Sequence, residues 1–114
     1  MHKDDGTTSE SLCDAVVSLA GHELNRSKLG GACSIVAHIL SKHYTTSATL
    51  TNLACIAIHL LSMDEENRHL IAGAGGCEAI VNVLTFHIAN QKVVENACRA
   101  IASISKVSYI IYVH

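Results

Sequence analysis

The twelve residues GAGGCEAIVNVL, at positions 73–84, place three glycines within four positions and continue directly into an apolar helical pattern. Glycine clusters before a helix occur in phosphate-binding loops and at sharp corners between helices. A GxxxxGK[ST] loop requires a lysine, and none follows Gly76, while a GxGxxG fingerprint requires a preceding strand, where this chain has a helical pattern. We therefore interpret the stretch as a structural corner between two helices.

The chain also repeats itself at an interval of about 42 residues, the size of a stacked helical repeat. Three similar apolar segments contain Cys13, Cys55 and Cys98, which are 42 and 43 residues apart. The pair Asn25–Arg26 recurs 42 residues later as Asn67–Arg68.

The glycines recur less regularly, because the pair at 30–31 returns at 75–76, after 45 residues. This alignment implies a loop three residues shorter before Gly31. We therefore expect Gly31 to form the corner of the middle repeat, whereas Gly73 has no counterpart there.

Apolar residues at helical spacing predict a chain made of helices. The acidic run from Asp64 to Glu66 is typical of a helix start, where negative charge is favourable. The long helices are expected at about 9–21, 31–42, 47–62, 76–86 and 91–106, and short helices near 23–29 and 65–72.

These segments resemble armadillo repeats. Residues 67–84, NRHLIAGAGGCEAIVNVL, are similar to the first two helices of the repeat, and residues 93–104, VVENACRAIASI, are similar to its third. The resemblance implies an all-α, right-handed superhelical α-solenoid of about two and a half repeats spanning residues 9–106. The expected parts are a third helix at 9–22, repeats at 23–62 and 63–106, a polar segment at 1–8 and an apolar tail at 107–114.

In the armadillo family, which includes β-catenin and importin-α, third helices line a concave groove that holds extended peptides. Tryptophan and asparagine of the pattern A-x-W-A-L-x-N point into that groove, and both are absent here, which argues against importin-like capture of basic signals. The positions carried over, together with those one turn earlier, define the expected partner groove: Glu10, Asp14, Ser18, Asn52, Ile56, Leu60, Glu95, Arg99 and Ser103.

Two of these residues are apolar and allow two interpretations. Ile56 and Leu60 fall on the groove side of their helix and could contact a partner. Neighbouring helices could instead cover them, because the segment LACIAIHLL is apolar nearly all round.

Composition excludes several other classes of function. The net charge is −2 and there is no basic run, so we expect no nucleic-acid partner. The longest apolar run, Leu53–Ile58, is too short to span a membrane, and no helix has the basic face of a membrane-surface helix. Five cysteines without a CxxC pair or export signal predict reduced thiols in the cytoplasm or nucleus.

No catalytic motif is present, so we expect neither an enzyme nor a cofactor. Cys55 and His59 lie four residues apart on one helix, but two ligands do not complete a zinc site. Cys33 and Cys77 follow helix-opening glycines, where the pKa of a thiol can be lowered. A metal- or redox-responsive Cys/His protein is therefore the alternative of another class.

The sequence thus predicts a non-enzymatic protein-interaction module or a fragment of a scaffold, with a protein or peptide in its groove. The alternative within binding proteins is a co-chaperone-like domain that grips a folded partner. A solenoid needs polar capping repeats, so we also expect the uncapped ends to self-associate. The tail at 107–114 is β-branched and aromatic, and is the stub of a further repeat, a docking segment or a β-prone end.

Overall fold

The computed structural model describes the backbone of residues 5–113 and the side chains of residues 6–106. The described residues are helical apart from short connections, which confirms the all-α prediction. The elements are α1 (Asp5–Ala20), α2 (Glu23–Arg26), the 3₁₀ helix η2 (Ser27–Leu29), α3 (Gly30–His43), α4 (Ala48–Leu61), α5 (Glu65–Gly73), α6 (Gly76–Phe86) and α7 (Gln91–Val113).

The observed boundaries differ from the expected ones mainly at the two ends of the chain. Helix α1 begins at Asp5, before the expected position 9, and α7 continues to Val113, past the expected position 106. The backbone of the tail is thus helical rather than extended as far as Val113. Residues 1–4, His114 and the side chains of the tail lie outside the described part of the chain.

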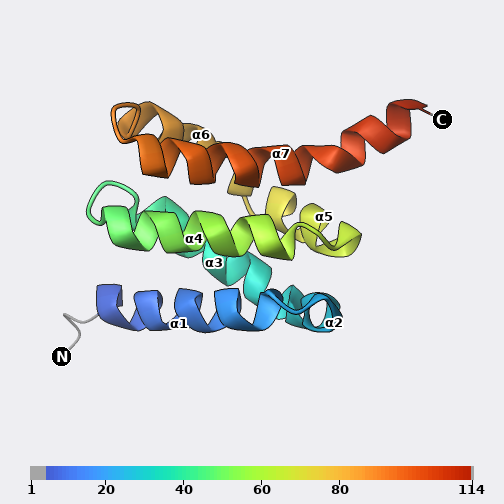
Figure 1. The fold of residues 1–114 in the computed structure, drawn as a ribbon, viewed down its shortest axis with the longest axis horizontal. Coiled ribbons are helices and arrows are strands. Elements are labelled where there is room, and N and C mark those ends of the chain that lie inside the picture. Colours follow the sequence, from blue (N-terminus) through green and yellow to red (C-terminus); the bar gives the residue numbers. More distant parts are fainter. Residues whose placement is uncertain (1–4, 114) are drawn as a thin grey trace.

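The three long helices α1, α4 and α7 lie side by side in one layer and run in the same direction (Figure 1). Helices α3 and α6 lie behind this layer, and α2 and α5 lie at the end where α1 and α4 finish (Figure 1). Each successive group of helices therefore packs on the one before it, with α4 in the middle of the layer.

Side chains cap the starts of two helices, and the acidic run from Asp64 to Glu66 predicted one of these starts. Ser47 accepts a hydrogen bond from the backbone N–H of Leu50 at 3.1 Å and begins α4. Asp64 accepts one from the N–H of Asn67 at 3.1 Å and begins α5, with two glutamates in the first turn. Each cap satisfies a donor that the start of a helix leaves unpaired.

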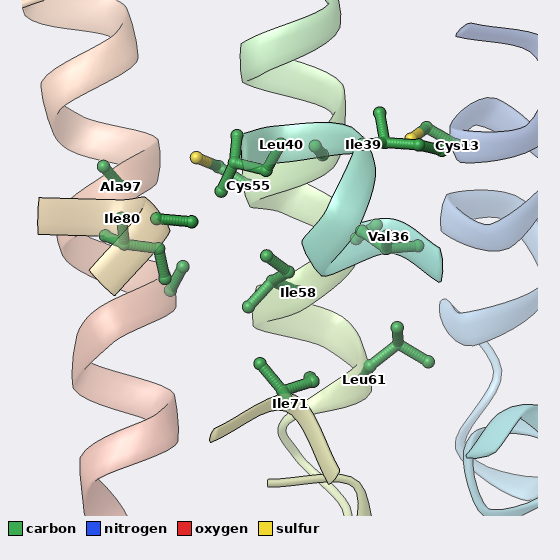
Figure 2. Packing of buried hydrophobic residues seen from close by; sticks show 14 of the residues in the cluster. Cys13, Val36, Ile39, Leu40, Cys55, Ile58, Leu61, Ile71, Ile80 and Ala97 are labelled. Carbon is green, nitrogen blue, oxygen red and sulfur yellow. The ribbon is translucent and has the colours of Figure 1, made fainter. Parts of the chain in front are cut away.

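The core consists of aliphatic side chains and cysteine, because the chain has only one Phe, three Tyr and no Trp. Ile58 of α4 lies toward Ile71 of α5, Leu61 points to the other side of α4, and Ile80 of α6 lies beside Ala97 of α7 (Figure 2). Burial of one such large aliphatic side chain contributes about 1.5–3 kcal/mol. Seven of the fourteen residues of α4 are buried and five more are half-buried, so α4 is the centre of the fold.

The glycine stretch forms the predicted corner, which bends α5 against α6 by 72°. Gly75 has a φ of 87°, the left-handed region that favours glycine, and it is the only described residue with a positive φ. A Cβ on Gly76 would meet the side chain of Ile71 and would lie 2.9 Å from its carbonyl oxygen. Two glycines are therefore needed here, one for the turn and one for the close approach of two helices.

The prediction that Gly31 forms the same corner in the middle repeat is wrong. No side chain or backbone atom lies within 4 Å of a Cβ built on Gly31, and the corner is turned by the 3₁₀ helix η2, with Leu29 at a φ of −100°. A 3₁₀ turn redirects the chain with negative φ angles throughout, so it needs no glycine.

Burial also corrects the alignment on which that prediction rested. The second helices match at an interval of 43 residues rather than 45, so the repeat length stays near 42 or 43 throughout. The equivalent buried positions are Cys33, Val36, Ala37 and Leu40 in α3, and Gly76, Ala79, Ile80 and Val83 in α6.

Candidate partner-binding face

The nine residues of the expected groove all lie on the helices of one layer, α1, α4 and α7. Their exposure differs: four are exposed, four are half-buried and one is buried. The exposed ones are Asp14, Ser18, Glu95 and Arg99, the half-buried ones are Glu10, Asn52, Ile56 and Leu60, and the buried one is Ser103.

Ser103 is 3% exposed because His59 of α4 covers it. The Nδ1 of His59 lies 2.7 Å from the Ser103 hydroxyl oxygen, so the two side chains hydrogen-bond across the α4–α7 contact. The sequence pointed to His59 only as a metal ligand beside Cys55. Ser103 therefore joins two repeats and is closed to a partner.

Burial lowers the pKa of His59, and the nearby positive charges of Arg99, Lys106 and Arg26 lower it further, against a hydrogen bond with the backbone of Arg99. The imidazole is consequently neutral at neutral pH. Arg99 and Lys106 of α7 and Arg26 of α2 therefore lie near the end of α4.

A second polar contact joins α4 to α7. The side-chain amide of Asn96 donates to the Oδ1 of Asn52 at 2.9 Å. Asn96 is buried, and sequence reasoning missed it because the armadillo pattern pointed to Glu95 next to it. Both this bond and the His59–Ser103 bond join residues 44 positions apart, so they fix the register between the two helices.

The centre of the face is apolar and without charge, because α4 contains no Asp, Glu, Lys or Arg. Leu60 packs partly against the core, whereas Ile56 is half-buried and does not belong to that cluster. Each of the two interpretations therefore applies to one of these side chains. Leu60 is largely a core residue, and Ile56 is the partly accessible apolar residue of the face.

The helices on either side of α4 carry opposite charges. Helix α1 presents Glu10 and Asp14, and no basic residue lies between Asp5 and Ala20. Helix α7 presents Arg99 and Lys106, together with Lys92 and one acid, Glu95. The face is thus acidic along α1, apolar along α4 and mainly basic along α7.

The buried thiols lack the lowered pKa that makes a cysteine reactive. Burial raises the pKa of Cys13 and Cys33 to about 11, with smaller contributions from Asp14 and Asp64 respectively, and raises that of Cys55 to about 12. The lowered pKa that a helix N-terminus can produce does not occur at Cys33, because burial outweighs the helix N-terminus. Among the described residues, no three side chains of His, Cys, Asp or Glu are grouped so as to hold a metal ion.

Two adjoining hollows lie away from this face, along the short first helices of the repeats. Their shared residue is Asp64. One is lined by Asp64, Glu65, Glu66, His69 and Leu70, and the other by Glu23, Leu24, Arg26, Ser27, Met63 and Asp64.

Within the described residues, no single helix is long and apolar enough to cross a membrane. Helices α5 and α6 together would reach the required length and apolar composition, but they are bent by 72°. Their large apolar residues Ile71 and Ile80 are fully buried in the core.

The comparison with protein families agrees with this geometry. Residues 64–106 match the family described as Armadillo/beta-catenin-like repeat, and the match covers α5, α6 and most of α7. A search of curated proteins and a search of solved structures gave no match.

Residues 64–106 therefore match an armadillo repeat, as the sequence resemblance indicated, within a chain whose described residues are helical. Armadillo repeats generally act as protein-interaction modules and are typically not enzymes.

Proposed function

We propose that the layer formed by α1, α4 and α7 is a non-enzymatic binding face for a protein or an extended peptide, and that the chain acts as an interaction module or scaffold fragment. The observation that carries the proposal is Ile56, a large apolar side chain at the centre of the face that is only half-buried and does not belong to the core cluster. An apolar centre with a polar surround is the usual anatomy of a partner site.

The charges on the flanking helices favour one orientation of the partner. A basic group of the partner would lie over Glu10 and Asp14 on α1, and an acidic group over Arg99 and Lys106 on α7. Packed helices are about 8–10 Å apart, so α1 and α7 are separated by roughly 20 Å. An extended peptide covers that distance with about six residues.

The test is a single charge placed at the centre of the face. We expect Ile56→Glu to abolish capture of specific proteins from a cell extract and to weaken binding of an identified, purified partner by at least roughly tenfold. The matched control is Ile35→Glu on α3, an exposed apolar residue on the opposite side of the layer that should leave binding unchanged.

Circular dichroism and melting must show that both variants fold like the wild type. If Ile35→Glu and Ile56→Glu weaken binding equally, or if neither does, the face is not the binding site. Leu60 is unsuitable for this test, because it packs against the core and a charge there would lower stability as well as binding.

The edge made by α2 and α5 supports a second candidate, a domain that grips a folded partner as a co-chaperone would. Leu24 is 78% exposed, and Met63 and Leu70 are also exposed beside the two hollows. The acids that line these hollows, Glu23 and Asp64–Glu66, would suit a basic partner surface.

The two candidates differ in which substitution removes binding. We expect Leu24→Glu, Leu70→Glu to block a partner at this edge and to leave binding through α4 intact. A partner lost with this double variant and retained with Ile56→Glu would assign the function to the edge.

A further inference from the structure

The cysteines at equivalent positions of the third helices differ in burial. Cys13 of α1 and Cys55 of α4 are fully buried, and each of these helices is covered by the next third helix of the layer. Cys98 of α7, the third member of the series, is exposed. Among the described residues, no helix packs on this side of α7.

The opposite end of the layer has a matching free side. Asn96 and Ser103 face α4 from α7 and are buried. Their equivalents on α1, 85 residues earlier, are Ser11 and Ser18, and both are exposed. The side of α1 that corresponds to a buried helix contact is therefore also open, and it consists of small residues.

We propose that a second copy of this chain stacks head to tail on the first, with its α1 on the free side of α7. The contact would repeat the geometry that already joins α4 to α7 within the chain, so it extends an interface that the fold contains. This inference does not depend on what the face of α4 binds.

The intramolecular contact specifies which residues meet. The Asn52–Asn96 bond corresponds to Glu95 with Ser11 of the second copy, where a carboxylate replaces an amide as the acceptor. The His59–Ser103 bond corresponds to Ala102 with Ser18 of the second copy, a smaller and unbonded pair.

Charge complementarity supports the same partner. Ile56 and Arg99 are equivalent positions of neighbouring helices, so the next position in the stack is Asp14 of the second copy. Both Arg99 and Asp14 are exposed and hence available to pair. Glu95 would lie next to Glu10 of the second copy, and these two negative charges repel each other. Lys92, one turn before Glu95, offsets this repulsion.

The arrangement is heterologous, since α1 of one copy meets α7 of the other, and it does not close on itself after two copies. Assembly should therefore continue beyond a dimer as the concentration rises. It should weaken with added salt, because the Asp14–Arg99 pair is exposed.

The experiment is sedimentation velocity of the full chain over a range of concentrations at low salt. We expect Asp14→Arg and Arg99→Asp each to raise the concentration needed for assembly by at least roughly tenfold. Mixing these two variants should restore assembly, because each free end then meets an opposite charge. Glu78→Arg on α6 is the control for a change of charge elsewhere and should have no effect.

A second variant separates packing from charge. Ala102→Tyr places a bulky side chain on the exposed face of α7 and should block assembly without changing the melting temperature. A wild type that stays monomeric at every soluble concentration, a species that stops at two copies, or single variants that assemble like the wild type would each overturn the proposal.

Discussion

At the scale of single residues, two arginines at equivalent positions of successive repeats form equivalent hydrogen bonds. Arg26 donates through Nε to the carbonyl of Ala20 at 2.7 Å, and Arg68 donates through Nη1 to the carbonyl of Ser62 at 2.8 Å. Both acceptors lie at the end of a third helix, where carbonyls lack a partner within the helix and positive charge is favourable. The recurrence of Asn-Arg after 42 residues thus reflects a link from each first helix to the preceding third helix.

We expect Arg68→Met to lower the free energy of unfolding by about 2 kcal/mol, because it removes a charge-assisted hydrogen bond from a buried carbonyl. Arg26→Met should cost less, since Arg26 is only half-buried. Guanidinium denaturation of both variants measures the difference. Equal costs, or no cost for Arg68→Met, would contradict the role of burial.

At the scale of elements, the two corners between first and second helices have different chemistry although they occupy equivalent places. The corner before α6 depends on the left-handed conformation of Gly75, whereas the corner before α3 is a 3₁₀ turn. Glycine therefore stabilises one corner and is dispensable near the other.

Alanine substitution should accordingly have opposite effects at the two corners. Gly75→Ala should destabilise the chain by about 1 kcal/mol or more, because alanine at a positive φ is strained. Gly31→Ala should stabilise it by roughly 0.5–1 kcal/mol, since Gly31 is an exposed helical residue with open space around its Cβ. Thermal melting of the pair checks the signs, and a loss of stability in Gly31→Ala would show that this glycine is structurally required.

At the scale of the whole molecule, buried thiols couple the stability of the array to pH. The pKa of Cys13 and Cys33 is about 11 and that of Cys55 about 12 in the folded chain, compared with 9.0 for an unperturbed thiol. Above pH 9 the unfolded chain loses thiol protons that the folded chain keeps, so the unfolded state binds fewer protons and the free energy of unfolding falls. This contribution is fully present below pH 9 and is lost as pH rises toward 11–12.

We expect Cys55→Ala to reduce the fall in stability between about pH 9 and 11, and Cys98→Ser, an exposed site, to leave it unchanged. Denaturation under reducing conditions across this range measures the two slopes against the wild type. A slope in Cys55→Ala equal to that of the wild type would show that the Cys55 thiol does not ionise on unfolding.

The sequence alone determined the features that depend on residues close to one another. Helical periodicity, the cap at Asp64 and the glycine corner at 75–76 are local, since each follows from side chains and backbone within one or two turns. The spacing of the cysteines then indicated the repeat, and through it the layer of third helices that carries the candidate face.

Only the tertiary structure decided the features that depend on contacts between repeats. Three features depend on which helix packs against which: the burial of Ser103 by His59, the pairing of Asn52 with Asn96 and the exposure of Cys98. The first two join residues 44 positions apart, and the third depends on the side of α7 that no described helix covers. The corner of the middle repeat differs from the prediction for a local reason, because a 3₁₀ turn and a left-handed glycine can redirect a chain equally well. Local patterns specify the helices, whereas packing between them determines which side chains remain available to a partner.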